Sequence, residues 1–588
     1  MIPNLNPFSP DQRKALSDLL ASFDAGQRLW LGGFLSAPAE AGAFAAAPTA
    51  KVPLTILYGT ESGNSESLAD LTAKTAKKKG FKPVMQNMAD CSPSDLTSIE
   101  NLLVIISTWG DGDPPETAEA FYQALMNEQA DFSKTKFSVC ALGDTSYEQF
   151  CETGKQVDAR LEALGASRIA DRADCDVDYE ESYQKWADTA LAVLAPVAVA
   201  AQVTSSAIPS LGASQYGKQN PFPAELLERV RLNGQGTKKE TLHYELSLEG
   251  SGLQYEPGDI LAVVPTNAPD MVEGILEASK LTGSEEVELK GGEKKALAEA
   301  LRENLEVTSV SRAILNKIHE ISPTDRLANL LQDSAKDELK EYLWGRWIAD
   351  ALKDFAPDGL QAEQLAGILR KLPPRLYSIA SSPLAHEDEV HLTVASVRYQ
   401  SHNQQRKGVA STYLADLVQK GDTIPIYTQQ NKNFRLPESG DTPIIMVGPG
   451  TGIAPFRSFV EHRSELGAKG KSWLFFGDQH YSYDFLYQLE WQDHLKSGAL
   501  SKIDAAFSRD QPEKVYVQDK MREQSKELYA WLQEGAHFYV CGDAERMAKD
   551  VHETLIGVVE QEGAMSREAA EEFVAGLKKE KRYQRDVY

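Results

Sequence analysis

The chain has 588 residues, more than a single hydrophobic core accommodates, so we expect three or four domains. Its composition is that of an ordinary globular protein, and its five cysteines form no CxxC pair, which argues against a disulfide scaffold or a zinc site. The net charge of −25 argues against a nucleic-acid partner, because phosphate contacts require clustered Lys and Arg.

Residues 1–51 combine a helix signal with a tether. Ser9 is a candidate N-cap followed by Pro10, and an amphipathic run extends to Leu35. The Ala/Pro-rich stretch that follows is typical of a flexible linker, and the whole segment is a candidate for oligomerisation. No secretory signal is evident and no apolar run is long enough for a bilayer, so we expect a cytoplasmic protein without membrane contact.

Residues 52–201 alternate apolar strands with helical stretches, which predicts a parallel sheet with crossover helices. The expected strands are LTILY, NLLVIIS and FSVCALG. This region carries 24 acidic and 12 basic residues, about half of the net charge in a quarter of the chain. Such a surface could be steered toward a basic partner, although acidic surfaces also maintain solubility, and charge alone favours the second interpretation.

A polar segment at 202–218 predicts a linker, and after it the hydrophobic period changes. Residues 219–440 contain alternating strands separated by turn residues, which predict an antiparallel barrel with a helical insert at about 268–366. The expected strands are ETLHYELSLEG, DILAVVP, EVHLTVASVRY and DTIPIYTQ.

Residues 441–588 return to alternating strands and helices. The strands PIIMVG, SWLFFG and HFYVCG predict a second nucleotide-type α/β domain. The expected fold class is therefore multidomain α/β plus a β-barrel.

Three polar loops follow the strands of the first sheet. Gly59–Ser65 connects a strand to a helix and would present backbone N–H groups to a phosphate, with an ordinary turn as the alternative. The other loops place Trp109 and Tyr147 at the ends of adjacent strands, where ligands bind in open α/β folds. Two aromatics beside a phosphate loop suit a flat ring held by stacking, and three such loops in order argue against simple loop packing.

These loops, YGTESGNS, STWGDGDPP and ALGDTSYEQFC, resemble the three FMN loops of flavodoxin and the diflavin reductases. The resemblance implies a flavodoxin-like domain that contacts the phosphate with its first loop and the ring with the other two. The implied phosphate contacts are Thr60, Glu61, Ser62, Gly63, Asn64 and Ser65. The implied ring contacts are Ser107, Thr108, Trp109, Gly110, Leu142, Gly143, Asp144, Thr145, Ser146, Tyr147, Glu148, Gln149, Phe150 and Cys151.

In the barrel, RLYS at 375–378 and GVAST at 408–412 resemble the FAD-binding signature of ferredoxin–NADP reductase-like barrels. The resemblance implies that Tyr377 stacks on the flavin, that Arg375 binds the pyrophosphate and that Ser378 lies near the reacting N5 atom. A plain strand and a plain helix cap are the alternatives for each motif alone. The other implied FAD contacts are Leu376, Thr393, Val394, Ala395, Tyr399, Gly408, Val409, Ala410 and Ser411.

The string GPGTGIAPFR at 448–457 resembles the dinucleotide loop of these ferredoxin–NADP reductase-like domains, with Gly450 and Thr451 as contacts. NADP sites supply cations and hydroxyls to the 2′-phosphate, whereas NAD sites use a carboxylate, and the residues after KIDAAF favour NADPH. The implied contacts there are Ser508, Arg509, Lys514, Val515, Tyr516, Val517 and Gln518. Asp550 matches a further cofactor contact, with a solvated helix residue as the alternative.

Four residues match the family positions that govern hydride transfer. The resemblance places Ser378, Cys541 and Asp586 beside the nicotinamide, where they would orient it without a covalent intermediate. An inert core residue is the alternative for Cys541. The terminal Tyr588 matches an aromatic that covers the FAD and would have to move aside for hydride transfer.

Residues 53–588 resemble the flavoprotein alpha-components of sulfite reductase, in stretches such as SRDQPEKVYVQDKMREQ, YVCGDAERMAKDV and the terminal RYQRDVY. That resemblance implies electron transfer from NADPH to FAD to FMN and then to a sirohaem, iron–sulfur subunit that reduces sulfite to sulfide in sulfur assimilation. The N-terminal segment of that family also assembles homo-oligomers, although residues 1–50 match poorly here. The chain has no cysteine set for a cluster, so sulfite must be reduced on another protein.

Two alternatives stay open. A soluble diflavin reductase serving a haem monooxygenase or another redox protein would share the fold and the motifs, since these do not choose the acceptor. A flavodoxin-like carrier or scaffold with inactive reductase domains would require loss of the RLYS residues, the GVAS residues or the CGDA residues at 541–544, and none is missing.

Overall fold

The computed structural model describes residues 51–61, 63–110, 112–127, 129–145, 147, 149–195, 215–290 and 292–588. The expected helix and tether within 1–50, most of the expected linker, and Ser62, Ser146 and Glu148 lie outside these ranges. Contacts within the chain divide it into two units, Met1–Val52 and Pro53–Tyr588. All the elements described below belong to the second unit, except that β1 begins at Val52, the last residue of the first. Among the described residues, no helix is both long and apolar enough to span a bilayer.

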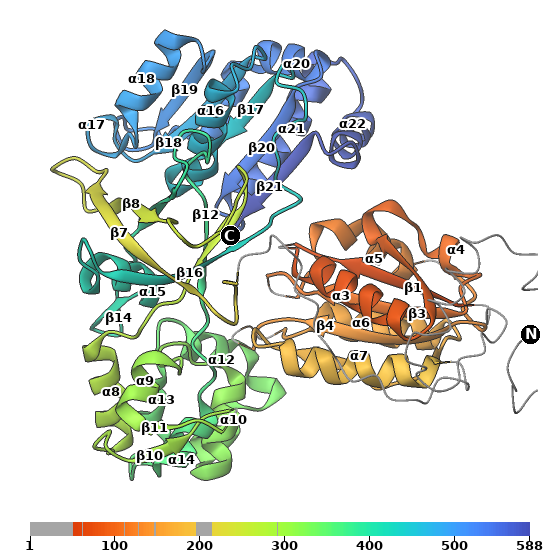
Figure 1. Ribbon diagram of the computed structural model, residues 1–588, viewed down its shortest axis with the longest axis vertical. Coiled ribbons are helices and arrows are strands. Elements are labelled where there is room, and N and C mark those ends of the chain that lie inside the picture. Colours follow the sequence, from red (N-terminus) through yellow and green to blue (C-terminus); the bar gives the residue numbers. More distant parts are fainter. Residues whose placement is uncertain are drawn as a thin grey trace, which may run out of the picture. The chain divides into compact units, whose positions relative to one another are not determined.

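The first α/β region is a sheet of order β2-β1-β3-β4-β5, with β6 also paired to β4 (Figure 1, red to orange). Its strands are β1 (Val52–Gly59), β2 (Phe81–Asn87), β3 (Asn101–Ser107), β4 (Lys136–Leu142), β5 (Ser167–Arg168) and β6 (Ala173–Cys175). Its helices are α3 (Asn64–Lys78), α4 (Pro93–Leu96), α5 (Glu119–Asn127), α6 (Glu152–Ala163) and α7 (Glu180–Leu194), with 3₁₀ turns η1 (Met88–Asp90) and η2 (Glu116–Ala118). β1, β3 and β4 are parallel, as predicted, and β3 is buried along almost its whole length because helices cover both faces.

The second region is an antiparallel sheet of order β12-β9-β16-β7-β8-β13, whose end strands lie next to each other. Its strands are β7 (Phe222–Arg231), β8 (Thr241–Ser247), β9 (Ile260–Val263), β12 (Arg375–Ser378), β13 (Glu389–Ala395) and β16 (Thr423–Gln429). Residues alternate between the two faces, so Leu242, Tyr244 and Leu246 of β8 enter the barrel core. The antiparallel barrel is confirmed.

One expected barrel strand is interrupted. The run EVHLTVASVRY ends its pairing with β8 at Ala395, and its last residues form the hairpin of β14 (Arg398–Ser401) and β15 (Gln404–Lys407). The chain then enters α15 (Val409–Thr412) and the π-helical turn η4 (Tyr413–Leu417). The alternation alone did not reveal this break, because it continues on both sides of it.

A helical insert with its own core lies between β9 and β12. Its helices are α8 (Pro269–Ser279), α9 (Leu297–Glu303), α10 (Arg312–Ile321), α11 (Asp325–Leu330), α12 (Lys336–Leu343), α13 (Ile348–Phe355) and α14 (Ala362–Ile368), with the turn η3 (Asp333–Ala335). A small hairpin, β10 (Glu286–Glu288) with β11 (Lys294–Ala296), was not predicted because its strands are short and mostly charged.

The last region is a parallel sheet of order β19-β18-β17-β20-β21 (Figure 1, teal to blue). Its strands are β17 (Ile444–Val447), β18 (Ser472–Asp478), β19 (Lys502–Phe507), β20 (His537–Gly542) and β21 (Tyr583–Val587). Its helices are α16 (Ala454–Glu465), α17 (Tyr481–Asp484), α18 (Gln488–Ser497), α19 (Val517–Glu523), α20 (Ser525–Gln533), α21 (Met547–Glu562) and α22 (Arg567–Lys579), with the turn η5 (Gly450–Ile453). The predicted α/β domain is confirmed, and β21 adds a strand that the sequence did not indicate.

Candidate active site

The loop after β1 is held in place by two hydroxyl side chains. The backbone N–H of Thr60 donates to Thr117 Oγ1 at 2.8 Å, and that hydroxyl donates to the Thr60 carbonyl at 2.7 Å. Thr60 Oγ1 in turn accepts the N–H of Gly63 at 2.9 Å. Gly63 has φ 82° and leads into α3, whose first turn has no side-chain cap. The loop therefore leaves the N–H groups at the start of α3 available to an anion.

The other two loops meet at the carboxyl ends of β3 and β4. The N–H of Thr108 donates to the Leu142 carbonyl at 2.8 Å, and Trp109 forms a tight turn with Asp113. Gly143 lies close to Cys151, and a Cβ added to Gly143 would be 2.8 Å from the backbone nitrogen of Cys151. Trp109 is half-buried, whereas Tyr147 is 53% exposed, so both rings are placed at the open edge of the sheet.

Two of the remaining expected ring contacts, Thr145 and Cys151, make hydrogen bonds within the protein. The hydroxyl and N–H of Thr145 both donate to Asp176, at 2.6 and 3.0 Å. The thiol of Cys151 is buried and points at the Ala141 carbonyl, at 3.4 Å, so it is engaged with the strand. Gln149 and Phe150 are half-buried in the same loop, and Gly110 has φ 51°.

Two serines fit a bound group at these loops. Within the described part of the chain, the hydroxyl oxygens of Ser65 and Ser107 are buried and have no hydrogen-bond partner. Ser65 is the second residue of α3, and Ser107 ends β3. Unsatisfied buried hydroxyls carry a free-energy cost that a ligand would remove. A phosphate at Ser65 and a polar ring edge at Ser107 would satisfy both, as FMN requires.

In the barrel, the RLYS residues form β12, which pairs with β9 so that Tyr377 lies opposite Leu261. Arg375 is exposed, Leu376 is half-buried and Tyr377 is half-buried. Burial raises the pKa of Tyr377 to about 12, so its ring remains neutral. A neutral aromatic beside an exposed guanidinium fits a stacked flavin with a pyrophosphate.

The other expected FAD contacts lie on β13, β14 and α15. Thr393 is buried and its hydroxyl is hydrogen-bonded to Tyr487 at 2.6 Å, and Val394 faces the barrel core, so at these two positions only the backbone is available to a ligand. Tyr399 is 43% exposed on β14. The GVAS residues Gly408–Ser411 begin α15, where Ser411 Oγ accepts the N–H of Val397 at 3.1 Å.

The nucleotide loop is packed against β20 so tightly that glycine is required. An added Cβ on Gly452 would lie 2.1 Å from the carbonyl oxygen of Cys541. Gly450 has φ 58°, and Thr451 Oγ1 is 2.9 Å from the Tyr588 hydroxyl. A loop with three glycines at the carboxyl end of β17 fits the close approach of a pyrophosphate.

The expected 2′-phosphate contacts surround the carboxyl end of β19. Arg509, Lys514 and Tyr516 are exposed, while Ser508 and Val515 are half-buried. Val517 is 2% exposed and belongs to the core, so its side chain points away from any ligand. Gln518 donates to Asp550 Oδ2 at 3.1 Å, so these two expected cofactor contacts lie side by side.

The three residues expected to orient hydride transfer lie together. Ser378 Oγ donates to Asp586 Oδ2 at 2.6 Å, and Cys541 Sγ donates to the same oxygen at 3.9 Å. They come from β12, β20 and β21, so the cluster joins the barrel to the last sheet. Burial raises the pKa of Asp586, although the Ser378 hydrogen bond opposes this rise. Burial also raises the pKa of Cys541, so the thiol stays protonated.

The terminal residue is anchored. The N–H of Tyr588 donates to the Gly542 carbonyl at 3.0 Å, and its own carbonyl accepts the N–H of Ala544 at 3.2 Å. Its side chain is 53% exposed and reaches Thr451 through the hydroxyl. The backbone of Tyr588 is therefore fixed to the end of β20, whereas a hydrogen bond to Thr451 engages its side chain.

Family models match this chain in three regions. The flavodoxin model matches residues 56–186, the FAD binding domain model matches 214–413, and the oxidoreductase NAD-binding domain model matches 446–553. The chain is 48% identical over 605 residues to the sulfite reductase (NADPH) flavoprotein alpha-component of Bacillus subtilis (strain 168), covering 99% of both chains. It is 42% identical to that of Klebsiella pneumoniae over 100% of this chain and 99% of the relative, and 41% identical to that of Vibrio cholerae over 99% and 96%.

The chain belongs to the sulfite reductase flavoprotein alpha-component family. The alignments extend over 99% and 100% of this chain. The flavodoxin, FAD-binding and NAD-binding models match the three regions that contain the predicted cofactor motifs.

Three supporting residues of this family member were not found from its sequence. Thr117 holds the first flavin loop, and Asp176 holds Thr145. Ser396, next to Ala395, has a buried hydroxyl without a partner among the described residues. Thr117 and Asp176 act across long sequence separations, so spacing gave no signal, whereas the position of Ser396 beside an expected FAD strand could have indicated it.

Proposed function

We propose that this chain transfers electrons from NADPH through FAD and then FMN to a sirohaem, iron–sulfur subunit that reduces sulfite to sulfide. The observation that carries the proposal is the Ser378–Asp586–Cys541 cluster between an FAD-type barrel and a dinucleotide loop, in a chain that also has a flavodoxin domain. The full-length similarity to flavoprotein alpha-components supports the choice of acceptor.

When bound, the nicotinamide supplies a hydride and the two flavins convert this two-electron donor into single-electron transfers. The protein positions the groups. Tyr377 would hold one face of the FAD ring, and Tyr588 would occupy the other until the nicotinamide displaces it. Because Thr451 and Gly542 anchor Tyr588 only through hydrogen bonds, this displacement breaks no covalent or ionic contact.

The cluster residues would bind and orient the nicotinamide. Asp586 accepts hydrogen bonds from Ser378 and Cys541 on one carboxylate oxygen, which fixes the carboxylate at the junction. Its second oxygen could accept from the carboxamide of the nicotinamide, and the Ser378 hydroxyl oxygen, whose proton goes to Asp586, could accept from an N–H donor. Since the Cys541 thiol is protonated and buried, it acts by packing and by donation.

The acceptor is proposed to be the beta subunit of an assimilatory sulfite reductase, with a homo-oligomer of this chain assembled through residues 1–51. The names of the relatives describe an alpha-component, which supports a partner subunit.

Sulfide formation from sulfite and NADPH tests the proposal. The purified chain loaded with both flavins is mixed with a sirohaem sulfite reductase subunit, and each protein is omitted in turn. We expect sulfide only when both are present. Rapid NADPH-driven reduction of cytochrome c without any sulfide would instead support a diflavin reductase that serves another redox protein.

A further inference from the structure

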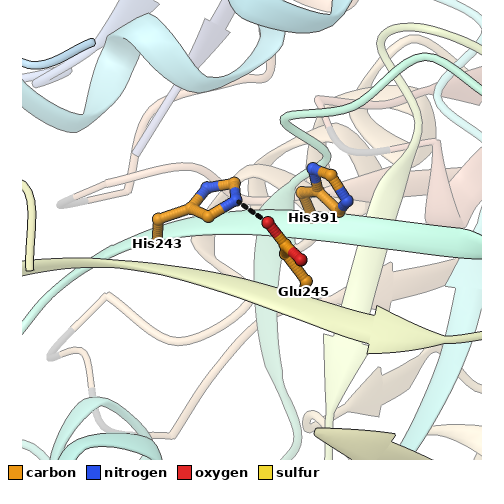
Figure 2. A group of neighbouring side chains, drawn as sticks. All are labelled: His243, Glu245 and His391. Atoms are coloured by element: carbon orange, nitrogen blue, oxygen red, sulfur yellow. Dashed lines mark hydrogen bonds and ion pairs between the residues drawn. The ribbon is translucent and has the colours of Figure 1, made fainter. Parts of the chain in front are cut away.

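Three polar side chains converge on the outer face of the barrel. His243 and Glu245 lie on β8, and His391 lies directly opposite Glu245 on β13. Because successive residues of a strand alternate between faces, all three point away from the barrel core that Leu242 and Tyr244 enter. Figure 2 shows the two imidazole rings and the carboxylate drawn together across the two strands. We call His243, Glu245 and His391 the histidine cluster.

The geometry of the histidine cluster is that of a ligand set. One ligand atom from each residue lies within 4.8 Å of the other two, and His243 Nε2 is 3.3 Å from Glu245 Oε1. The rings of His243 and His391 are 5.0 Å apart and nearly perpendicular. His386 and Glu389 form a second such set with His391, so further ligands are within reach.

The two rings are buried, and one of them is held by an outer hydrogen bond. The side chains of His243 and His391 are only 8% and 1% exposed. Tyr487 contacts Nδ1 of His243 at 2.9 Å, which orients its Nε2 toward Glu245.

The charges beside the rings are mixed, with the carboxylates of Glu245 and Glu389 on one side and the guanidinium of Arg457 on the other. In the part of the chain that the structure describes, no Lys or Arg forms an ion pair with Glu245 or Glu389. Arg457 approaches His391 Nδ1 at 3.3 Å, but it makes shorter contacts to Glu490 at 2.6 Å, the Ala380 carbonyl at 2.8 Å and Glu461 at 2.9 Å. If it lost the His391 contact, Arg457 would remain compensated by two carboxylates.

We propose that the histidine cluster binds one divalent transition-metal ion, with Zn²⁺ as the ion that the two imidazoles and one carboxylate suit best. Glu245 is 32% exposed, which gives the ion access and leaves a fourth position for water. The bound ion would link β8 to β13. Through Tyr487, which also contacts Thr393 at 2.6 Å, it would hold the barrel against the last α/β region. Its expected effect is a more stable junction for hydride transfer.

Zinc affinity of the flavin-loaded full chain tests this site. The protein is freed of metal with a chelator and titrated with ZnCl₂ in competition with a chromophoric chelator. We expect one tight equivalent and a higher unfolding temperature with Zn²⁺ present. Glu245→Gln, which keeps the shape of the side chain, should weaken binding by at least about 10-fold, and Tyr487→Phe should weaken it by about 10-fold through loss of the outer hydrogen bond.

The matched control is His402→Asn, which removes an exposed histidine elsewhere on the barrel region and should leave the tight equivalent unchanged. Flavin content and the unfolding temperature without metal report whether each variant has folded. If the wild type has no tight equivalent, or if Glu245→Gln and His243→Asn bind Zn²⁺ as tightly as the wild type, the proposal is overturned.

Discussion

At the scale of single residues, the proposed chemistry depends on Asp586. Its carboxylate collects the hydrogen bonds of Ser378 and Cys541, so a change at this one oxygen alters the positions of both. Replacement by asparagine keeps the size of the side chain but substitutes an amide for a group that accepts from both neighbours. The cluster should then lose its orientation without losing its packing.

Asp586→Asn should slow the reduction of bound FAD by NADPH by roughly 10- to 100-fold, the cost of a misplaced reactant. Anaerobic rapid mixing with NADPH, followed at the flavin absorbance, measures this step. The control is Asp441→Asn, an exposed residue in the turn before β17, which should react as the wild type does. Unchanged FAD reduction in Asp586→Asn would remove the cluster from the proposed mechanism.

Glu61 should make the flavodoxin domain sensitive to pH. Burial, followed by the charge of Glu116, raises the pKa of Glu61 to about 7, well above its usual value. A carboxyl whose folded pKa is raised stabilises the fold below its unfolded pKa, and that contribution is lost as pH rises through the folded pKa. Glu61→Gln cannot ionise and keeps an oxygen that can accept the N–H of Glu116.

The variant should therefore match the wild type at pH 5 and retain FMN to a higher temperature at pH 8. FMN fluorescence during heating reports the release. A difference between the two proteins that stays constant from pH 5 to pH 8 would contradict the assignment of this pKa.

At the scale of elements, glycines at strand ends decide whether the nucleotide loop can close. Gly452 packs against the carbonyl of Cys541, so any side chain there must push η5 away from β20. Gly557, in the interior of α21, has nothing within 4 Å of an added Cβ. The same substitution should thus have opposite consequences at the two positions.

Gly452→Ala should lower the unfolding temperature and raise KM for NADPH, because the loop that approaches the pyrophosphate is displaced. Gly557→Ala should stabilise the protein by about 0.5–1 kcal/mol, since alanine is favoured over glycine inside a helix. Thermal unfolding and steady-state kinetics of both variants check this, and equal effects from the two substitutions would refute the packing argument.

The elements also show what the sequence can and cannot predict. Apolar runs followed by turn residues located six of the strands, namely β1, β3, β4, β17, β18 and β20. β21 has the polar sequence YQRDV and is held by pairing with β20, a long-range contact that leaves no local pattern. The hairpin of β10 and β11 escaped prediction for a similar reason, because its strands are short and charged.

The sequence predicted the motif residues of the candidate site but not the tertiary contacts that hold them. Motif residues such as Ser378, Cys541 and Asp586 come from distant positions, and only the resemblance to a known family indicated that they meet. The engagement of Thr393 with Tyr487 and the burial of Val517 depend on tertiary packing, which no motif encodes. The residues that hold the loops in place, Thr117 and Asp176, were missed for the same reason.

At the scale of the whole molecule, the charge is concentrated in the region that carries the flavodoxin fold. Residues 52–200 hold 24 acidic and 12 basic residues, and the flavodoxin model matches within this span. If this surface attracts a basic acceptor subunit, added salt should reduce the rate of transfer at low acceptor concentration several-fold. Reduction of a small neutral quinone by the same protein should change little, and equal salt effects on both acceptors would argue against electrostatic steering.

The central claim is that electrons reach the acceptor subunit only through FMN. The most direct measurement compares sulfide formation by the FMN-depleted chain, which retains FAD, with the same preparation after FMN is added back. We predict that the depleted chain still bleaches its FAD with NADPH but makes no sulfide with the sirohaem subunit, and that FMN restores sulfide formation. Sulfide formation at the full rate without FMN would contradict the proposed order of transfer.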